Sequence, residues 1–236
     1  MPEKATHARF PVKFSFARVN NARRLPLKER VKRLLGRLDR AYPQATCALE
    51  HEHPWQLLIS TILSAQCTDE RVNRVTQTLF RKYHSLKDFA TADRRELEAD
   101  IRPTGFFRNK TKSIVGATKL LVEKFGGELP RTMAELLELP GVARKTANVV
   151  LGTAFGITSG VVVDTHVMRL ARRLDLSKQE NPEKIEQDLM TIIPRKKWIL
   201  LSHQLIWHGR LVCQARQPRC HACPVEDLCY SKDKTL

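Results

Sequence analysis

Apolar positions recur along most of the chain at the spacing of an α-helix. Between Leu27 and Tyr42 they fall every three or four residues, and Arg and Lys occupy the opposite face. The same spacing predicts helices over 54–64, 69–83, 93–101, 107–125, 131–137, 142–156, 164–174, 182–191 and 195–211. Strand-like alternation is nearly absent, and the β-branched run at 161–163 is too short to build a sheet. The chain is therefore predicted to be all-α.

Composition indicates a basic globular protein. Its 236 residues, 42% of them apolar, are enough for one or two domains with a substantial core. Lys and Arg number 41 against 25 acidic residues, and this formal charge of +16 recurs along the chain. It favours a polyanionic partner such as nucleic acid, although a merely soluble basic protein is the alternative. Residues 1–26 carry scattered basic side chains with little periodicity and are expected to form a flexible extension.

The chain shows no sign of membrane insertion or export. It has no window of about 18 apolar residues, and its polar, basic start lacks the apolar core of a signal peptide. We therefore expect a cytoplasmic or nucleoid location. In that reducing compartment the six cysteines should not form disulfides, and the isolated Cys47 and Cys67 are expected to be small core residues.

Four cysteines near the C-terminus have the pattern of a metal site. Thiolates on short loops suit an iron–sulfur cluster or zinc. Zinc sites more often pair two C-x2-C knuckles, whereas here a single one is flanked by wider steps, which favours a [4Fe–4S] cluster. Arg216 and Arg219 lie inside the first interval, where a metal-bound loop could present them to phosphate. The pattern is C-x6-C-x2-C-x5-C, made by Cys213, Cys220, Cys223 and Cys229.

A Pro-Gly turn followed by a lysine is the main candidate for chemistry. Pro140-Gly141 predicts a tight turn, and the residues after it have helical apolar spacing. The first N–H groups of such a helix lack partners and the dipole is positive there, which suits a phosphate oxygen. Lys145 lies in the first turn and Asp164 follows nineteen positions later, so an amine and a carboxylate could share one cleft. The alternative is that Lys145 is an ordinary solvated charge.

Several motifs together resemble the endonuclease III family, the helix-hairpin-helix DNA glycosylases and apurinic/apyrimidinic lyases of base-excision repair. They lie in the family's order between about residues 27 and 230. One departure is Ala143, where the family's hairpin often has a second glycine. The motifs are the hairpin with its lysine, Val163-Asp164-Thr165-His166, Leu63-Ser64-Ala65-Gln66 with Thr68-Asp69, and the cysteine spacing.

The resemblance implies two helical domains that flank a DNA-binding groove. A six-helix barrel with the helix-hairpin-helix motif would occupy 47–159. A discontinuous second domain, formed by 27–46 and 160–236, would hold a [4Fe–4S] cluster on the four C-terminal cysteines. We expect a monomer that binds double-stranded DNA containing damaged bases or abasic sites.

For the chemistry, the resemblance implies Lys145 as nucleophile and Asp164 as proton acceptor and charge stabiliser. A lysine of ordinary pKa is only about 0.04% neutral at pH 7, so we expect partial burial and the positive helix end to disfavour the ammonium form. Attack on C1′ of a deoxyribose would give a Schiff base, and β-elimination would then cut the strand. The target base must first leave the duplex.

The resemblance also implies which residues contact DNA. Gln66 would fill the gap left by the extruded nucleotide, and Phe106 would wedge the opposite side. The alternatives are an ordinary residue at a helix C-terminus for Gln66, core packing for Phe106, and a capped or core histidine for His166. The remaining expected contacts are Gly141, Ala143, Arg144, Thr165, His166, Arg216 and Arg219.

The resemblance implies a bifunctional glycosylase and lyase that removes oxidised pyrimidines from duplex DNA. Two other functions compete with this prediction. An adenine mismatch glycosylase of the same superfamily generally lacks the hairpin lysine and has a catalytic glutamate before the Gln segment, but residues 59–62 contain no acid. A non-enzymatic helix-hairpin-helix DNA-binding protein with a structural metal is the third possibility. For the cluster, a structural role that holds the Arg216 and Arg219 loop is preferred to a redox role.

Overall fold

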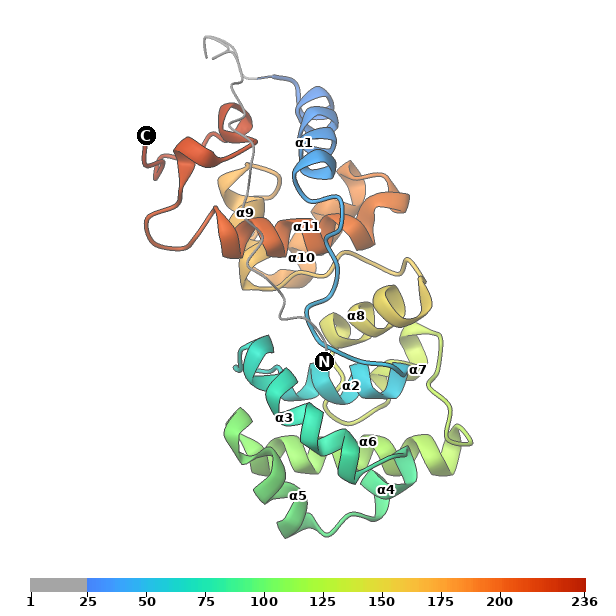
Figure 1. Cartoon of the computed structure of the whole chain (residues 1–236). Helices are drawn as coiled ribbons and strands as arrows, with labels where there is room; N and C mark the ends of the chain where they lie inside the picture. Colours follow the sequence, from blue (N-terminus) through green and yellow to red (C-terminus); the bar gives the residue numbers. More distant parts are fainter. Residues whose placement is uncertain (1–24) are drawn as a thin grey trace.

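The computed structural model describes residues 25–236 and shows two lobes made of helices (Figure 1). Most of the predicted N-terminal extension lies outside the described residues. No β-strand occurs in residues 25–236, and the predicted all-α class is confirmed. The lower lobe of Figure 1 contains α2 (Pro54–Leu63), α3 (Asp69–Lys82), α4 (Leu86–Thr91), α5 (Arg94–Ile101), α6 (Phe107–Lys124), α7 (Met133–Leu137) and α8 (Arg144–Phe155). The upper lobe contains α1 (Leu27–Ala41), α9 (Thr165–Arg173), α10 (Pro182–Ile192) and α11 (Trp198–Leu211).

Short 3-10 helices complete the two lobes. In the lower lobe η1 (Arg102–Thr104) precedes α6, and in the upper lobe η2 (Arg195–Lys197) precedes α11. Two more, η3 (Cys220–Ala222) and η4 (Glu226–Leu228), lie in the C-terminal segment. None of the helices in the described part of the chain is both long enough and apolar enough to span a lipid bilayer.

Each lobe has its own hydrophobic core. The core residues of the lower lobe fall between 49 and 151, and those of the upper lobe fall in 31–45 and 161–228. Within the upper core, Leu34 and Leu38 of α1 are almost completely buried, and each such leucine contributes about 1.5–3 kcal/mol. The N-terminal helix thus joins the C-terminal helices. The domain boundaries predicted at 46/47 and 159/160 lie between these two sets of residues and stay predictions.

Local sequence signals explain where the helices begin and end. The Thr68 hydroxyl accepts a hydrogen bond from the Arg71 backbone N–H, which caps α3. At the end of α6, Gly126 and Gly127 adopt positive φ angles of 62° and 83°, and the Gly127 N–H donates to the Leu121 carbonyl at 2.9 Å. These positions favour glycine because a side chain is strained at such angles.

Helix α4 was not expected from the apolar spacing, which left 84–92 without a helix. Its six residues are too few to show a helical period. The available signal was a capping box, in which Ser85 and Asp88 each accept a backbone hydrogen bond from the other. Phe89 of α4 is fully buried in the lower core, so α4 packs firmly on the lobe.

The two lobes are joined by specific contacts at their junction, where α8 lies (Figure 1). Arg144 and Asn148 of α8 both donate to the Glu186 carboxylate of α10. On the other side, Arg210 of α11 pairs with Asp69 of α3 at 2.6 Å. These polar contacts join α8 and α3 to the upper lobe.

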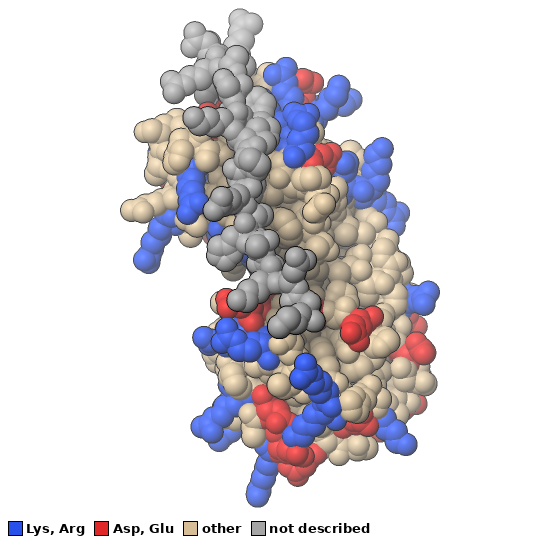
Figure 2. Space-filling model, in the orientation of Figure 1, with Lys and Arg blue, Asp and Glu red and all other residues tan. Residues whose placement is uncertain are grey.

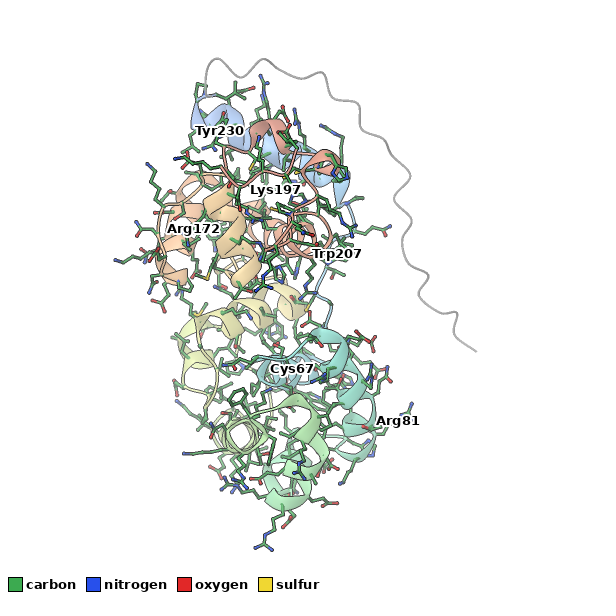
Figure 3. All side chains as sticks on the ribbon, turned by 90° about the vertical axis from the view of Figure 1, so that its left-hand side faces the viewer. Cys67, Arg81, Arg172, Lys197, Trp207 and Tyr230 are labelled. Carbon is green, nitrogen blue, oxygen red and sulfur yellow. The ribbon has the colours of Figure 1, made fainter. Side chains whose placement is uncertain are left out.

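The chain crosses between the lobes close to Trp207. Its indole Nε1 donates to the Thr46 carbonyl at 3.0 Å, next to Cys47. Figure 3 shows Trp207 in the upper lobe and Cys67 at the end of the lower lobe that faces it. Cys47 and Cys67 are half-buried and pack against the lower core, in agreement with their expected role as small apolar residues.

Candidate functional site

The predicted Pro-Gly turn connects α7 to α8. The Val142 N–H donates to the Leu139 carbonyl at 3.1 Å and closes the turn. Gly141 has a φ of 78°, and a Cβ there would lie 2.5 Å from the Ser113 Cβ of α6. Glycine is therefore required both by the backbone angle and by the close approach of α6. Ala143, in contrast, has a φ of −94° and a ψ of 170°, so the missing second glycine causes no strain.

Gly141→Ala is expected to destabilise the protein by about 1–3 kcal/mol and to weaken its binding to DNA. The new methyl group must displace Ser113 and would be held at an unfavourable φ. Chemical denaturation and fluorescence anisotropy with duplex DNA measure the two effects. Ala143→Gly is the matched control and should leave both nearly unchanged, because its backbone suits any residue. Equal effects of the two variants would contradict this account of the turn.

The N-terminus of α8 is open to an anion. Its N-cap residue Ala143 offers no side-chain acceptor, and its first turn contains no acidic residue. Ala143 and Lys145 are exposed. The first N–H groups and the positive end of the helix dipole thus have no acidic partner from the first turn, which suits a phosphate group.

Arg144 has a different partner from the one expected. Its guanidinium donates two hydrogen bonds to the buried Glu186 carboxylate, at 2.7 and 3.1 Å, and this raises the pKa of Arg144. Asn148 donates to the same carboxylate at 2.9 Å and accepts from the Ser159 hydroxyl. Gly160 leaves room for the Glu186 carboxylate, since a Cβ at position 160 would lie 1.9 Å from its Oε1. In this structure Arg144 holds α8 against α10, and its contact with DNA stays a prediction.

Lys145 and Asp164 each lie at the start of a helix. Lys145 is the second residue of α8 and is exposed, so the expected partial burial of its side chain is wrong. Asp164 is half-buried and caps α9, where its Oδ1 accepts the Val167 N–H at 2.8 Å. This hydrogen bond fixes the carboxylate at the N-terminus of α9, next to the exposed Thr165.

The charge of Lys145 acts on a group at the junction of the lobes. Burial is the main cause that raises the pKa of Cys47. The Asp69 carboxylate raises it further, whereas Arg210 and Lys145 lower it. The positive charge of Lys145 thus favours the thiolate form of Cys47, as the charge of Arg210 does.

The charge of Asp164 favours the protonated form of the His166 imidazole. Burial is the main cause that lowers the pKa of His166, Asp164 opposes it, and Arg169 and Arg210 add to it. The His166 ring is also held in place, with Nδ1 3.1 Å from the Arg169 guanidinium. Gly209 allows α11 to pack closely against His166, since a Cβ at position 209 would lie 2.9 Å from the His166 Cβ. The Arg210 guanidinium lowers the pKa of both Cys47 and His166.

Gln66 and Phe106 are both exposed and both have left-handed backbones, with φ angles of 53° and 49°. Phe106 is 62% exposed, which excludes the core-packing alternative. Gln66 lies beyond the end of α2, in a turn where the Cys67 N–H donates to the Ser64 carbonyl. A left-handed non-glycine residue costs about 1–3 kcal/mol and is often found at functional sites. Their roles in DNA stay predictions.

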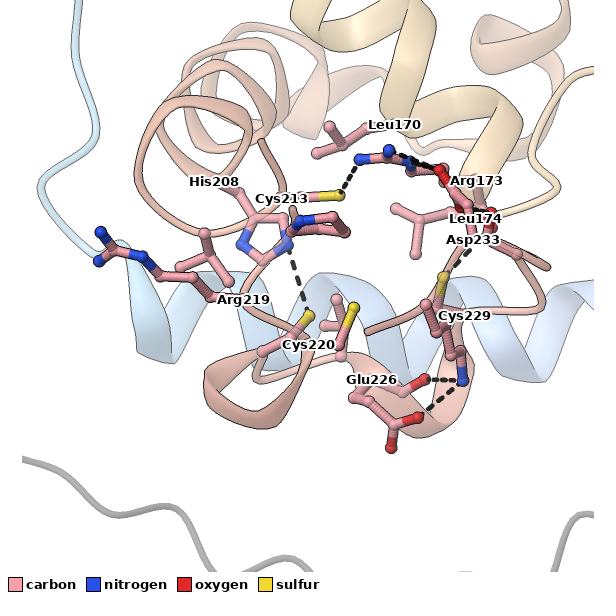
Figure 4. Close-up of a pocket in the computed structure, with 16 residues that line it drawn as sticks. Leu170, Arg173, Leu174, His208, Cys213, Arg219, Cys220, Glu226, Cys229 and Asp233 are labelled. Carbon is pink, nitrogen blue, oxygen red and sulfur yellow. Dashed lines mark hydrogen bonds and ion pairs between the residues drawn. The ribbon is translucent and has the colours of Figure 1, made fainter. Parts of the chain in front are cut away.

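The four C-terminal cysteines line one pocket of the upper lobe (Figure 4). Cys213 follows α11, Cys220 begins η3, and Cys229 follows η4. Burial raises the pKa of the Cys223 thiol to about 12, and the other three thiols add to this effect. Such thiols ionise readily only when a positive centre compensates their charge, so the set fits a metal or iron–sulfur ligand site. Among the described residues, no three or more His, Cys, Asp or Glu side chains are placed as ligands of one metal ion.

Nitrogen donors approach the sulfur atoms of the pocket. Arg173 donates to the Cys213 Sγ at 3.3 Å, and the buried His208 has its Nε2 3.5 Å from the Cys223 Sγ (Figure 4). The Tyr42 hydroxyl is 2.8 Å from Nδ1 of the same ring. With the hydroxyl as donor to Nδ1, Nε2 carries the proton and donates to the sulfur. Such second-layer hydrogen bonds orient thiolate ligands.

The loop between Cys213 and Cys220 carries the two predicted arginines on its outer side. Both Arg216 and Arg219 are exposed. The Arg219 N–H donates to the Val212 carbonyl at 2.9 Å, and its side chain extends away from the pocket in Figure 4. Of the nine predicted DNA contacts, seven are exposed and therefore accessible to a duplex: Gln66, Phe106, Gly141, Ala143, Thr165, Arg216 and Arg219.

Comparison with known proteins agrees with this geometry. Residues 59–195 match the HhH-GPD superfamily of base excision DNA repair proteins. Endonuclease III of Synechocystis sp. is 55% identical over 86% of this chain and 93% of its own length. The chain belongs to the endonuclease III family. Endonuclease III of Escherichia coli is 38% identical over 92% of this chain and 99% of its own length. Family membership makes the protein a DNA glycosylase and apurinic/apyrimidinic lyase of base-excision repair.

Solved structures of the endonuclease III family have the same fold. A non-covalent endonuclease III–DNA complex aligns with a TM-score of 0.83 and 42% identity, over 87% of this chain and 96% of the other. A trapped covalent endonuclease III–DNA intermediate with an estranged adenine gives the same TM-score over 97% of its chain. A thermostable thymine-DNA glycosylase, 22% identical, shares the fold.

Several contacts at these sites, and the residues Glu186, His208 and Arg210 that make them, were not predicted from the sequence. Asp69 and Arg210 are 141 positions apart, and Arg144 and Glu186 are 42 positions apart, so no local pattern reveals either pair. His208 precedes Cys213 by five positions, and a histidine so close to a cysteine ligand was an available signal.

Proposed function

We propose that the protein removes oxidised pyrimidines from duplex DNA with Lys145 as nucleophile and Asp164 as proton acceptor. The Lys145 Nζ, once deprotonated, attacks C1′ of the extruded nucleotide, and the bond from C1′ to the base breaks. Asp164 accepts the lysine proton or stabilises positive charge on the sugar as the base leaves. The observation that carries the proposal is that Lys145 is exposed in the first turn of α8 while the Asp164 carboxylate is fixed at the start of α9, in a chain of the endonuclease III family.

The same intermediate accounts for strand cleavage. The sugar opens to an imine between Lys145 and C1′, which acidifies the C2′ proton. Loss of that proton forms a C2′–C3′ double bond and breaks the C3′–O bond, so the 3′ phosphate leaves with its bridging oxygen, and hydrolysis of the imine releases the lysine. One amine thus serves both base release and strand cutting.

For DNA binding we infer that the duplex lies across the junction of the lobes. The open N-terminus of α8 and the exposed Arg216 and Arg219 supply phosphate contacts. Gln66 and Phe106 enter the base stack while the target nucleotide is extruded. Figure 2 shows Lys and Arg side chains spread over both lobes, which suits a partner that contacts both. The similarity to two endonuclease III–DNA complexes supports this arrangement.

Binding to DNA is expected to weaken steeply with salt, because each phosphate contact releases counterions. Replacing both Arg216 and Arg219 with Gln should reduce the slope of log affinity against log salt by about 2. Anisotropy titrations of an undamaged duplex at several salt concentrations measure the slope. An unchanged slope in the double variant would show that the cysteine loop does not contact phosphate.

A panel of single-lesion duplexes tests the proposed substrate. Release of oxidised pyrimidines with a covalent adduct under borohydride supports the proposal. Release of adenine from a mismatch without an adduct would replace it with the mismatch glycosylase. Binding without release of any base would instead support a non-enzymatic DNA-binding protein.

We infer that Cys213, Cys220, Cys223 and Cys229 hold a [4Fe–4S] cluster, as their spacing and shared pocket indicate. With a cluster bound, these four cysteines would link the end of α11 to the C-terminal segment and fix the loop that carries Arg216 and Arg219. Its role in this proposal is structural. The Arg173 and His208 donors would orient the thiolates that bind it.

Cys213→Ser is expected to lower iron and acid-labile sulfide content and to weaken DNA binding at least about tenfold, because several phosphate contacts depend on the loop. Metal analysis, visible absorption and anisotropy measure these quantities. Cys67→Ser is the matched control for metal content and should keep the iron. Zinc without sulfide in the parent protein would overturn the cluster assignment, and unchanged DNA binding in Cys213→Ser would overturn its structural role.

A further inference from the structure

A lysine is buried between the two loops that carry Gln66 and Phe106. Lys110 of α6 is 4% exposed. Its Nζ donates to the Leu63 carbonyl at 2.7 Å and to the Thr104 carbonyl at 2.8 Å. Leu63 is the last residue of α2, and Thr104 is the last residue of η1. One ammonium group therefore joins the ends of two helices that are 41 positions apart in the sequence.

A buried ammonium is costly unless its hydrogen bonds compensate for the lost water. Burial lowers the pKa of Lys110, as this cost requires. A methionine of similar length would fill the same space without that cost. The two hydrogen bonds to carbonyl groups therefore explain best why a lysine occupies this buried position.

Each carbonyl lies two or three residues before an exposed residue with a left-handed backbone. Leu63 is three residues before Gln66, and Thr104 is two residues before Phe106. Within residues 25–236, the other hydrogen bonds of residues 64–68 and 102–106 stay within the same loop or run to an adjoining helix, as those from Gly105 to Arg102 and from Ser64 to Ser60 do. Lys110 is thus the polar link between the loops in the part of the chain that the structure describes.

We propose that Lys110 is a positioning residue that couples the Gln66 and Phe106 loops, so that both side chains enter the duplex as one unit. The inference rests on the proposed function, in which these two side chains occupy the base stack. With the link intact, a shift of one loop moves the other. Without it, each loop approaches the DNA independently.

Lys110→Met keeps the side-chain length and removes both hydrogen bonds. Thr111→Val is the matched control, since Thr111 is equally buried on α6 and its hydroxyl has no hydrogen-bond partner in the structure. Base extrusion is measured with a fluorescent base analogue at the target position. Lys110→Met should lower extrusion about tenfold, and Thr111→Val should leave it unchanged.

A double-substitution cycle separates coupling from simple stability. In the parent, Gln66→Ala and Phe106→Ala should each lower extrusion about tenfold, and the double variant should be little worse than either alone. In the Lys110→Met background the two effects should multiply. Lys110→Arg keeps donors for both carbonyls and should restore part of the non-additivity. Should Lys110→Met fail to fold, Lys110→Gln, which reaches at most one carbonyl, is measured in the same cycle.

Multiplicative effects in the parent, or the same non-additivity with and without the lysine, would overturn the inference while the roles of the two side chains stand. If neither Gln66→Ala nor Phe106→Ala changes extrusion, the proposed roles of these side chains are wrong, and the inference fails with them.

Discussion

Replacing Lys145 with Gln is expected to lower the rate of strand cleavage at an abasic site by at least about 10³-fold and to eliminate the covalent adduct that borohydride traps. Glutamine keeps hydrogen-bonding capacity at the start of α8 but cannot form an imine. Because Lys145 is exposed and has a fixed place in the first turn, the substitution should leave the fold intact. Gel assays of cleavage and adduct formation, with circular dichroism, measure these outcomes.

The matched control is Lys178→Gln, which removes the same charge from an exposed position after α9. It should cleave and form adducts like the parent. Binding of the Lys145 variant to a duplex with a stable abasic-site analogue should fall only modestly, because one phosphate contact at most is lost. An adduct that persists in Lys145→Gln would assign the nucleophile to another amine.

Helical periodicity was sufficient to predict most of the fold. Helix α1 is an example: its apolar stripe predicted 27–42, and α1 spans Leu27–Ala41 with that stripe in the core. Helix α4 was missed because six residues carry no period, and only the Ser85–Asp88 capping box indicates it. Short helices depend on tertiary contacts such as that of Phe89, which a sequence pattern cannot display.

The candidate site could also be predicted only in part, because local motifs are visible in the sequence and long-range contacts are not. Lys145, Asp164 and the cysteines lie in compact motifs, so short segments were enough to single them out. Lys110 and Arg210 contribute through partners 47 and 141 positions away, and those contacts exist only after the helices pack. The exposure of Lys145 was also misjudged, because burial at a helix start depends on the neighbouring lobe.

The contribution of Asp164 can be separated from its structural role at the start of α9. Asp164→Asn is expected to slow base release about 10²–10⁴-fold, because an amide neither accepts the lysine proton nor stabilises a positive sugar. Its side-chain oxygen can still accept the Val167 N–H, and Asn is as good an N-cap as Asp, so stability should hardly change. Asp164→Ala should slow base release similarly and also lose about 1 kcal/mol of stability with the cap. Single-turnover base release, thermal unfolding and binding to an abasic-site analogue distinguish the two effects. Parent-like base release in the Asn variant, with a normal adduct at Lys145, would mean that Asp164 only caps the helix and that another group takes the proton.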